Sequence, residues 1–305
     1  MKWKTRITEM LGCKYPILLG AFGGFGTSAI AAPVSEAGGF GIITAGALRT
    51  PEKLRDDIRR CRDMTDKPFG INLSLTMCPQ IDKLLEVAIE ERVAAIETAV
   101  YRADHLGRRI QEAGIPWLHK AASINHAISA DQLGGPDAIG VLGIDGGGHK
   151  SPTMLPTMTQ IPMVVKQVKV PVLASGNIGD GRGFLAALIM GAEGVILGTA
   201  FMATKECPIA ESLKQRLVED SPMELAYRHR AFEPPDEAEV ERIRRGEVLA
   251  RTRRGSMGAG GSFVVGLIHR IRTCQEVIDD IISEAEAILV HDGPLARMGA
   301  TRLPE

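Results

Sequence analysis

The sequence has almost no net charge, few cysteines and no long apolar run. Its 36 Lys and Arg against 37 Asp and Glu give a net charge of −1, so charge gives no reason to expect nucleic acid or an anionic membrane as a partner. The five cysteines are scattered, without CxxC or Cys/His spacing for zinc, and are typical of reduced cytosolic thiols. No apolar run reaches the roughly 18 residues of a membrane span, and the amino-terminal MKWKTRITEML lacks the apolar core of a signal peptide. We therefore expect a cytoplasmic protein.

A regular alternation of apolar runs with helical patterns fills the first two thirds of the chain. Six runs predict strands at residues 15–20, 40–45, 69–75, 95–99, 115–122 and 138–143, and residues 171–201 contain two more. Helical patterns separate them at residues 29–37, 52–62, 80–91, 104–113, 124–133 and 158–168, and we expect Thr27 or Ser28 to cap the first and Thr50 the second. The strands are continuous apolar runs, as strands covered on both faces are. Eight such units, without a GxGxxG after the first strand, favour an α/β fold of the TIM (β/α)8 barrel type over a doubly wound sheet.

The last third of the chain departs from this period. Residues 209–246 are rich in charge, residues 251–262 (RTRRGSMGAGGS) are basic and glycine-rich, and residues 277–289 have a final amphipathic pattern. We divide the chain into a barrel with its eight strands at residues 1–208 and a helical insertion and tail at residues 209–305. We expect the second part to pack on the barrel and cover its open end, not to fold as an independent domain.

Residues 171–201 (PVLASGNIGDGRGFLAALIMGAEGVILGTAF) predict a strand, a glycine turn, a helix, a strand and a second glycine turn. Ser175, Gly176 and Asn177 end the first of these strands, and Gly198 and Thr199 end the second. Glycines leave main-chain N–H groups uncovered, and in (β/α)8 barrels a phosphate often binds at the loops after strands seven and eight. The stretch therefore predicts an oxyanion site, although an ordinary βαβ unit packed through glycines would look the same.

Polar side chains and bare main chain occur at other strand ends as well. Residues 20–26 carry few side chains, which suits a flat ring lying against the main chain, or else a plain turn. Asn72 and Ser74 are polar in an otherwise apolar strand, and they either face a ligand or form hydrogen bonds at the barrel rim. Lys120 is costly to bury alone, so we expect an anionic or electron-rich partner for it.

The sequence DGGGH at residues 145–149 follows the sixth strand. Its three glycines let the main chain pass close to a flat ligand, while His149 presents an imidazole whose protonation can change near neutral pH. A histidine of a packed core is not expected on such a loop, so we assign a function to His149. Asp145 either holds the loop or accepts a hydrogen bond from a ring N–H of a cofactor. The remaining histidines in helical or tail contexts are expected at the surface: His105, His126, His229, His269 and His291.

Together these motifs resemble the nitronate monooxygenase (2-nitropropane dioxygenase-like) family of FMN-dependent barrels, which includes NADH:quinone reductases and flavin enoyl-acyl-carrier-protein reductases. The matching segments are YPI at 15–17, FGINLSL at 69–75, LHK at 118–120, GGGH at 146–149, ASGNIGDGRG at 174–183, GVILGTAF at 194–201, ATKECP at 203–208 and GGSFVVGLI at 260–268. The resemblance implies FMN as the cofactor and His149 as the active-site base or polariser. It places the FMN phosphate on Gly176, Asn177, Gly198 and Thr199. The full set of expected cofactor contacts is Ala21, Phe22, Asn72, Lys120, Asp145, Gly147, Gly148, Ser175, Gly176, Asn177, Gly198 and Thr199.

The chain departs from the family pattern within these motifs. The family usually has Glu-Ala-Gly-Gly-His in the histidine loop and a glycine two residues later, where this chain has Asp145 to His149 and then Ser151. Asn177 replaces the second of two adjacent glycines in the phosphate turn, and Ala200 stands where the family often has Arg. Asparagine tolerates left-handed backbone, so we expect FMN binding to survive and the changes to affect the choice of substrate.

The resemblance implies an FMN-dependent oxidoreductase whose default activity is the oxidation of alkyl nitronates with O2. One alternative is an NAD(P)H-dependent reductase of a quinone or an enoyl thioester, in which Arg251, Arg253 and Arg254 would grip a phosphorylated carrier such as coenzyme A. Another is a flavin-binding barrel without turnover, against which His149 argues. We expect a small-molecule substrate, no nucleic-acid, membrane or metal partner, and NAD(P)H as electron donor in the reductase case; a homodimer stays open.

Overall fold

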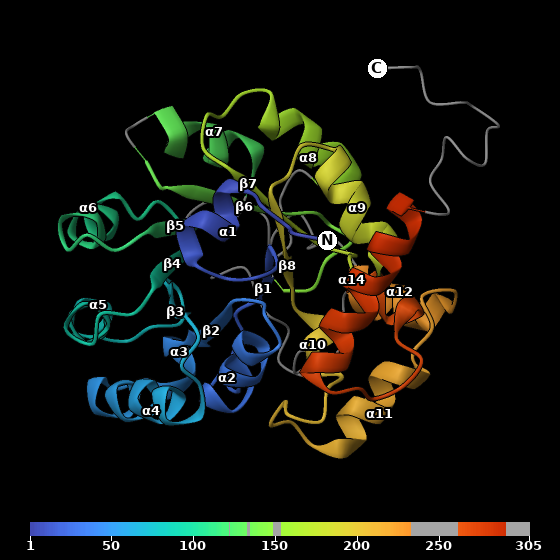
Figure 1. Cartoon of the computed structure of the whole chain (residues 1–305), viewed down its shortest axis with the longest axis horizontal. Helices are drawn as coiled ribbons and strands as arrows, with labels where there is room; N and C mark the ends of the chain where they lie inside the picture. Colours follow the sequence, from blue (N-terminus) through green and yellow to red (C-terminus); the bar gives the residue numbers. More distant parts are fainter. Residues whose placement is uncertain (122, 133–134, 149–153, 233–261, 291–305) are drawn as a thin grey trace.

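Eight parallel strands form the centre of the molecule (Figure 1). The computed structural model describes residues 1–121, 123–132, 135–148, 154–232 and 262–290. The strands are β1 (Ile17–Leu19), β2 (Gly41–Thr44), β3 (Phe69–Ser74), β4 (Ala95–Val100), β5 (Trp117–Ala121), β6 (Ala138–Leu142), β7 (Val172–Ser175) and β8 (Gly194–Leu197). They lie in the order β1-β8-β7-β6-β5-β4-β3-β2, and a parallel bridge between Leu18 and Phe40 closes the ring beside β2. The TIM barrel expected from the sequence is confirmed.

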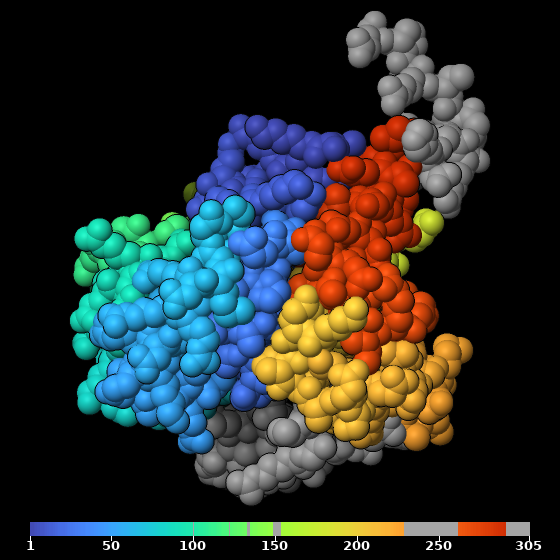
Figure 2. All heavy atoms as spheres, turned by 60° about the horizontal axis from the view of Figure 1, so that its bottom comes forward, coloured from blue at the N-terminus to red at the C-terminus, as the bar shows by residue number. Residues whose placement is uncertain are grey.

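Helices surround these strands on the outside (Figure 1). In chain order they are α2 (Ser28–Glu36), α4 (Pro51–Met64), α5 (Ile81–Glu90), α6 (Asp104–Glu112), α7 (Ile124–Gln132), α8 (Thr157–Val165) and α9 (Gly181–Ile189). The carboxyl-terminal helix α14 (Cys274–Val290) packs against α9 and α2, and so lies in the ring between the last and first of these helices. The space-filling view shows its red atoms beside the blue amino-terminal part (Figure 2), where Trp3 Nε1 donates to Glu286 at 3.1 Å.

Further helices lie before, between and after the barrel units. They are α1 (Arg6–Leu11), α3 (Ala45–Leu48), α10 (Thr199–Met202), α11 (Glu211–Glu219), α12 (Leu225–Phe232) and the 3-10 helix η1 (Phe263–Leu267). The apolar pattern did not predict α1, which begins with a capping box between Thr5 and Thr8 and ends at Gly12 with φ 68°. Across the described ranges, no helix is long and apolar enough to cross a bilayer.

The start of α2 is stabilised by a residue distant in the sequence. Thr27 occupies the N-cap position, but its side chain makes no capping hydrogen bond. Instead the buried Asp57 of α4 accepts from the Ser28 N–H at 2.8 Å and from the Ser28 hydroxyl at 2.6 Å. At α4 the expected cap is confirmed, because Thr50 Oγ1 accepts from the Lys53 N–H at 3.4 Å.

Alternate residues of each strand face the helices or the barrel interior. A Cβ on Gly41 of β2 would lie 2.0 Å from the Ala31 oxygen of α2, so this position faces outward. On β5, Trp117 also faces outward, because a Cβ on Gly107 of α6 would lie 2.3 Å from its ring. Positions of opposite parity face inward. Their polar members toward the carboxyl ends of β2 to β5 are Thr44, Asn72, Ser74, Glu97 and Lys120. Thr44, Asn72 and Glu97 lie level in register.

Candidate functional site

The loops after β6, β7 and β8 contact one another through glycine and a hydroxyl. A Cβ on Gly146 would lie 2.7 Å from the Cα of Gly176, and one on Gly147 would lie 3.5 Å from the Thr199 hydroxyl. The Gly143 N–H donates to the Ser175 oxygen at 3.0 Å, which continues the pairing of β6 and β7 into the loops. Because a side chain at Gly146 would force the loops apart, glycine is required there for the three strand ends to converge.

The turns after β7 and β8 present main-chain N–H groups without main-chain acceptors. Gly176 has φ 112° and Asn177 has φ 53°, so both adopt left-handed backbone. Among the described residues, the N–H groups of Gly176, Asn177, Gly198 and Thr199 donate to no main-chain oxygen. We call these four groups the N–H cluster. Successive main-chain donors in such turns bind anions, so the cluster has the chemistry to hold a phosphate or a carboxylate.

Asp145 fastens the loop after β6 to α8. Its Oδ1 accepts from the Thr157 hydroxyl at 2.7 Å and from the Thr157 N–H at 3.1 Å. Its main-chain oxygen accepts from the Phe263 N–H at 3.1 Å, which links the loop to η1. Of the two roles considered for Asp145, holding the loop is therefore the one for which the structure provides contacts.

The segment after β1 is packed rather than loose. The Phe22 N–H donates to Thr44 Oγ1 at 3.0 Å, and the buried Phe22 ring stacks on Phe25 with 4.9 Å between centroids. A Cβ on Gly198 would lie 3.8 Å from the edge of the Phe22 ring. Phe22 therefore forms a wall next to the N–H cluster, and the half-buried Ala21 precedes it.

A polar pair lies inside the barrel on β3 and β4. Asn72 is 0% exposed and Glu97 is 2% exposed, and Asn72 Nδ2 donates to Glu97 Oε1 at 2.5 Å. Asn72 Oδ1 is buried and has no hydrogen-bond partner among the described residues. Lys120 of β5 is half-buried and lies against β6, its Cγ 3.4 Å from a Cβ built on Gly140. No sequence motif pointed to Glu97, although it is the lone acid in the strand AIETAV.

Two histidines pair behind β5, on its outer face. Thr98 Oγ1 accepts from Trp117 Nε1 at 2.8 Å and lies 2.8 Å from His119 Nδ1, so its own proton can be donated to that nitrogen. His119 Nε2 lies 3.2 Å from His126 Nε2 of α7. Burial lowers the pKa of His119 to about 3, with a further contribution from His126. Burial and the charge of Arg102 also lower the pKa of His126. The expectation that His126 is a surface residue is wrong, because its side chain is half-buried against the outward-facing His119.

Other predicted residues have simpler surroundings or are not described. The Ser175 hydroxyl donates to the Ile196 oxygen at 3.3 Å and so bridges β7 and β8. Gly148 is exposed, with φ 86°. His149 lies outside the described residues, as do Arg251, Arg253 and Arg254. The structure thus brings together the N–H cluster, Gly147, Asp145 and Phe22, and it places Asn72 and Lys120 in the barrel interior.

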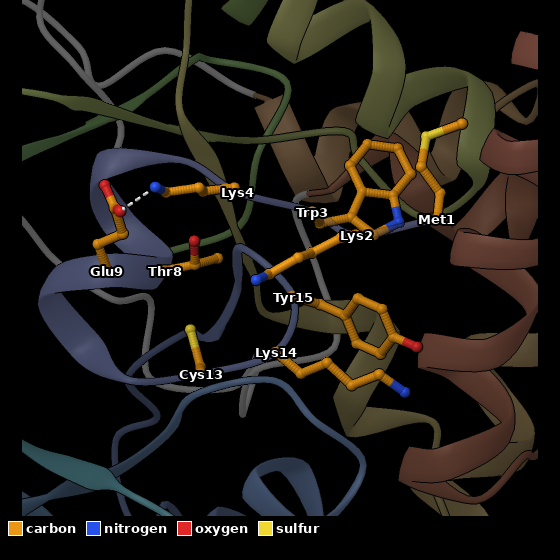
Figure 3. A pocket seen from close by; sticks show the side chains of 9 residues that line it. All are labelled: Met1, Lys2, Trp3, Lys4, Thr8, Glu9, Cys13, Lys14 and Tyr15. Carbon is orange, nitrogen blue, oxygen red and sulfur yellow. Dashed lines mark ion pairs between the residues drawn. The ribbon is translucent and has the colours of Figure 1, made fainter.

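A pocket of about 480 Å³ lies elsewhere, around the residues that precede β1 (Figure 3). Its walls include Trp3, Lys4, Cys13 and Tyr15, and none of the predicted site residues lines it. Burial raises the pKa of the Cys13 thiol to about 12, which keeps it protonated and a poor nucleophile. This pocket belongs to the amino-terminal end of the strands, whereas chemistry in this fold takes place at the carboxyl ends.

Comparison with known proteins places these residues in a wider context. A family model described as nitronate monooxygenase matches residues 4–101 and 77–233, which include the loops after β6, β7 and β8. A probable nitronate monooxygenase of Staphylococcus aureus (strain MSSA476) is 31% identical over 258 residues, covering 70% of this chain and 72% of the relative. A 5-hydroxy-7a-methyl-1-oxo-octahydro-1H-indene-4-carboxyl-CoA dehydrogenase of Rhodococcus jostii (strain RHA1) is 33% identical over 211 residues, covering 69% of this chain and 58% of the relative. The solved structure of FabK from Thermotoga maritima is 33% identical, has a TM-score of 0.78 and covers 94% of this chain and 97% of its own.

Proposed function

The chain belongs to the nitronate monooxygenase family of flavin-dependent oxidoreductases, and from this we propose that it oxidises alkyl nitronates with O2 at the carboxyl ends of its strands. The N–H cluster carries the assignment of the site. It gathers four main-chain donors that lack main-chain acceptors among the described residues. It lies at the loops after strands seven and eight, where barrels of this type hold phosphates.

The residues present fit FMN at two separate points. The N–H cluster offers four main-chain donors to a phosphate. In the barrel interior, the unpartnered Asn72 Oδ1 offers an acceptor, and the oxidised isoalloxazine ring has one N–H to donate. A donor cluster at the loops suits the phosphate of FMN, and an acceptor inside the barrel suits its ring. The other proposed contacts are Ala21, Phe22, Lys120, Asp145, Gly147, Gly148 and Ser175.

When bound, FMN supplies the redox chemistry, taking electrons from the substrate and passing them to O2. The protein binds and orients the reactants. Lys120 brings a positive charge into the barrel interior, where it favours an anionic nitronate and an electron-rich ring edge. The Phe22 ring lies beside Gly198, and Asp145 holds the loop that leads to His149.

His149 is the proposed proton-handling residue. An imidazole near neutral pH can take a proton from the carbon that bears a nitro group, which converts a neutral nitroalkane into its nitronate. A nitronate supplied directly needs no such transfer. His149 would then contribute only a hydrogen bond or a charge to the bound anion.

This difference between substrates gives the test of the proposed function. The purified protein should bind FMN, and anaerobic mixing with propyl nitronate should bleach the flavin. His149→Asn should retain FMN and lose about 10²–10⁴-fold of the rate with a neutral nitroalkane, with a much smaller loss on the nitronate. His105→Asn, at an exposed position of α6, is the matched control. Absence of FMN binding, or a His149→Asn variant with full activity on both substrates, would contradict the proposal.

The same experiment decides the second candidate function, an NAD(P)H-dependent flavin reductase of an enoyl thioester or a quinone. This alternative is favoured by similarity to a carboxyl-CoA dehydrogenase and by 33% identity to FabK across 94% of the chain. For the reductase, NADH or NADPH should bleach the flavin and propyl nitronate should not. Flavin that is bleached by none of the three would indicate a binding protein without turnover.

A further inference from the structure

Glu97 is a buried carboxylate with little to hold it. It lies in the barrel interior at 2% exposure, level with Asn72 on β3 and with the apolar Leu118 on β5. Among the described residues, the amide nitrogen of Asn72 is the single hydrogen-bond donor to this carboxylate, at 2.5 Å. Burying a charge with one neutral partner is unfavourable, and an apolar side chain of the same size would pack the interior at lower cost. The position therefore calls for a function.

The function of Glu97 follows from which atoms of Glu97 and Asn72 can donate a hydrogen bond. A carboxylate only accepts hydrogen bonds, whereas an asparagine amide has one end that donates and one that accepts. Glu97 therefore holds the Asn72 amide with Nδ2 toward the carboxylate. The opposite end, Oδ1, is left buried, without a partner in the described part of the chain, and able only to accept. A neutral residue at position 97 would allow either orientation of the amide.

We propose that Glu97 is a positioning residue for the flavin: it fixes the Asn72 amide so that Oδ1 accepts from the ring N–H of the oxidised isoalloxazine. This inference rests on the proposed flavin site and adds to it a residue that does not itself touch the cofactor. The oxidised ring has one N–H, flanked by two carbonyl groups, so an amide turned the wrong way would place a donor against a donor. The carboxylate thus makes the interior selective for a ligand that donates at this point.

The experiment compares FMN with N3-methyl-FMN, in which a methyl group replaces the ring N–H. Apoprotein is titrated with each flavin, and binding is followed by the change in flavin fluorescence. The wild-type protein should prefer FMN. In Glu97→Gln the amide can turn, so the preference should fall by about fivefold, which corresponds to the loss of one neutral hydrogen bond. Asn72→Ala should lower the preference at least as far, because the acceptor is then absent.

A purely structural role for Glu97 makes a different prediction. In that case Glu97→Gln would lower the thermal stability of the apoprotein and would weaken the binding of FMN and of N3-methyl-FMN equally. We expect the opposite, an apoprotein at least as stable as wild type, since an unfavourable buried charge has been removed. Glu91→Gln is the matched control, because Glu91 is also largely covered but pairs with Arg55, Arg59 and Arg62; it should leave the preference unchanged.

An unchanged preference in Glu97→Gln would overturn the inference while leaving the proposed function in place. If Glu97→Gln does not fold, Glu97→Met serves the same comparison, since its apolar side chain of similar length also leaves the amide unconstrained. A wild-type protein without affinity for FMN would overturn the proposed function and this inference together. A wild-type protein that binds FMN but does not oxidise nitronates would overturn the activity alone, and the preference for FMN would still decide the role of Glu97.

Discussion

Acid should destabilise this protein through a histidine that its fold keeps uncharged. His119 is 1% exposed and lies between Thr98 and His126, at 2.8 Å and 3.2 Å. Burial lowers its pKa from the ordinary 6.5 to about 3. Below pH 6.5 the unfolded chain therefore binds a proton that the folded chain does not, and the free energy of unfolding falls. The stability that comes from keeping His119 uncharged is fully present above pH 6.5, and it is lost progressively as the pH falls toward 3.

The size of the effect follows from the pKa difference. Each pH unit below 6.5 lowers the free energy of unfolding by about 1.4 kcal/mol per such histidine. At pH 5 the loss from His119 is about 2 kcal/mol, a substantial part of the roughly 5–15 kcal/mol typical of folded domains. The pKa of His126 is lowered as well, by burial and by Arg102, with Asp104 opposing, so its contribution has the same sign.

Urea unfolding at pH 7.5, 6 and 5, with the same FMN concentration in every sample, measures this loss. His119→Asn should be less stable at pH 7.5 but should lose about 2 kcal/mol less than wild type between pH 7.5 and 5. The comparison cancels the acid groups that both proteins share. His105→Asn, on the exposed side of α6, should follow the wild-type curve. A wild-type protein equally stable at pH 7.5 and 5, or a His119→Asn variant with the wild-type pH dependence, would refute the reasoning.

Three further predictions follow from the packing around the site and between the helices. A Cβ on Gly198 meets no described atom closer than 3.8 Å, so Gly198→Ala should keep FMN. Gly198→Glu should fold but bind FMN about 100-fold more weakly, because a carboxylate competes with the phosphate. Equal dissociation constants for the two variants would contradict this. Gly107→Ala should lower the free energy of unfolding by about 1–3 kcal/mol, since its Cβ would lie 2.3 Å from the Trp117 ring, and an unchanged urea midpoint would refute that contact. Asp57→Ala should cost about 1–3 kcal/mol by leaving the Ser28 donors unpaired, with Asp57→Asn losing less by the same measurement.

The barrel could be predicted from the sequence because its strands are covered on both faces. Such strands are continuous apolar runs, as in AIGVLG at residues 138–143, and the helical patterns between them have the period of amphipathic helices. The pattern could not predict α1, which begins through a local capping box at Thr5 and Thr8. Nor could it place α14, because an amphipathic pattern shows that a helix packs but not against which elements. Its neighbours α9 and α2 lie far from it in the chain.

The candidate site could be predicted in part, for reasons that differ between residues. Gly176 and Asn177 stood out because few residues besides glycine and asparagine adopt left-handed backbone, and both have it. Glu97 did not stand out, since a single acid in a short apolar run does not show which face it occupies. His126 was misjudged because its partner, His119, lies on another element. Contacts between elements depend on register and packing, which local periodicity does not contain.

The two faces of β4 and β5 connect the stability of the barrel to the proposed site. On the outside, Thr98 accepts from Trp117 and lies against His119, so these hydrogen bonds tie β4 to β5. On the inside, Glu97 lies next to Thr98 on β4 and Lys120 lies next to His119 on β5, so both side chains face the barrel interior. A slip of one residue between the strands would turn the side chains of one strand to the opposite face and send its interior charge, Glu97 or Lys120, outward. The outer network opposes that slip, because Thr98 reaches Trp117 and His119 together in one register. The hydrogen bonds of Thr98 on the outer face of the barrel thereby help to keep Glu97 and Lys120 on its inner face.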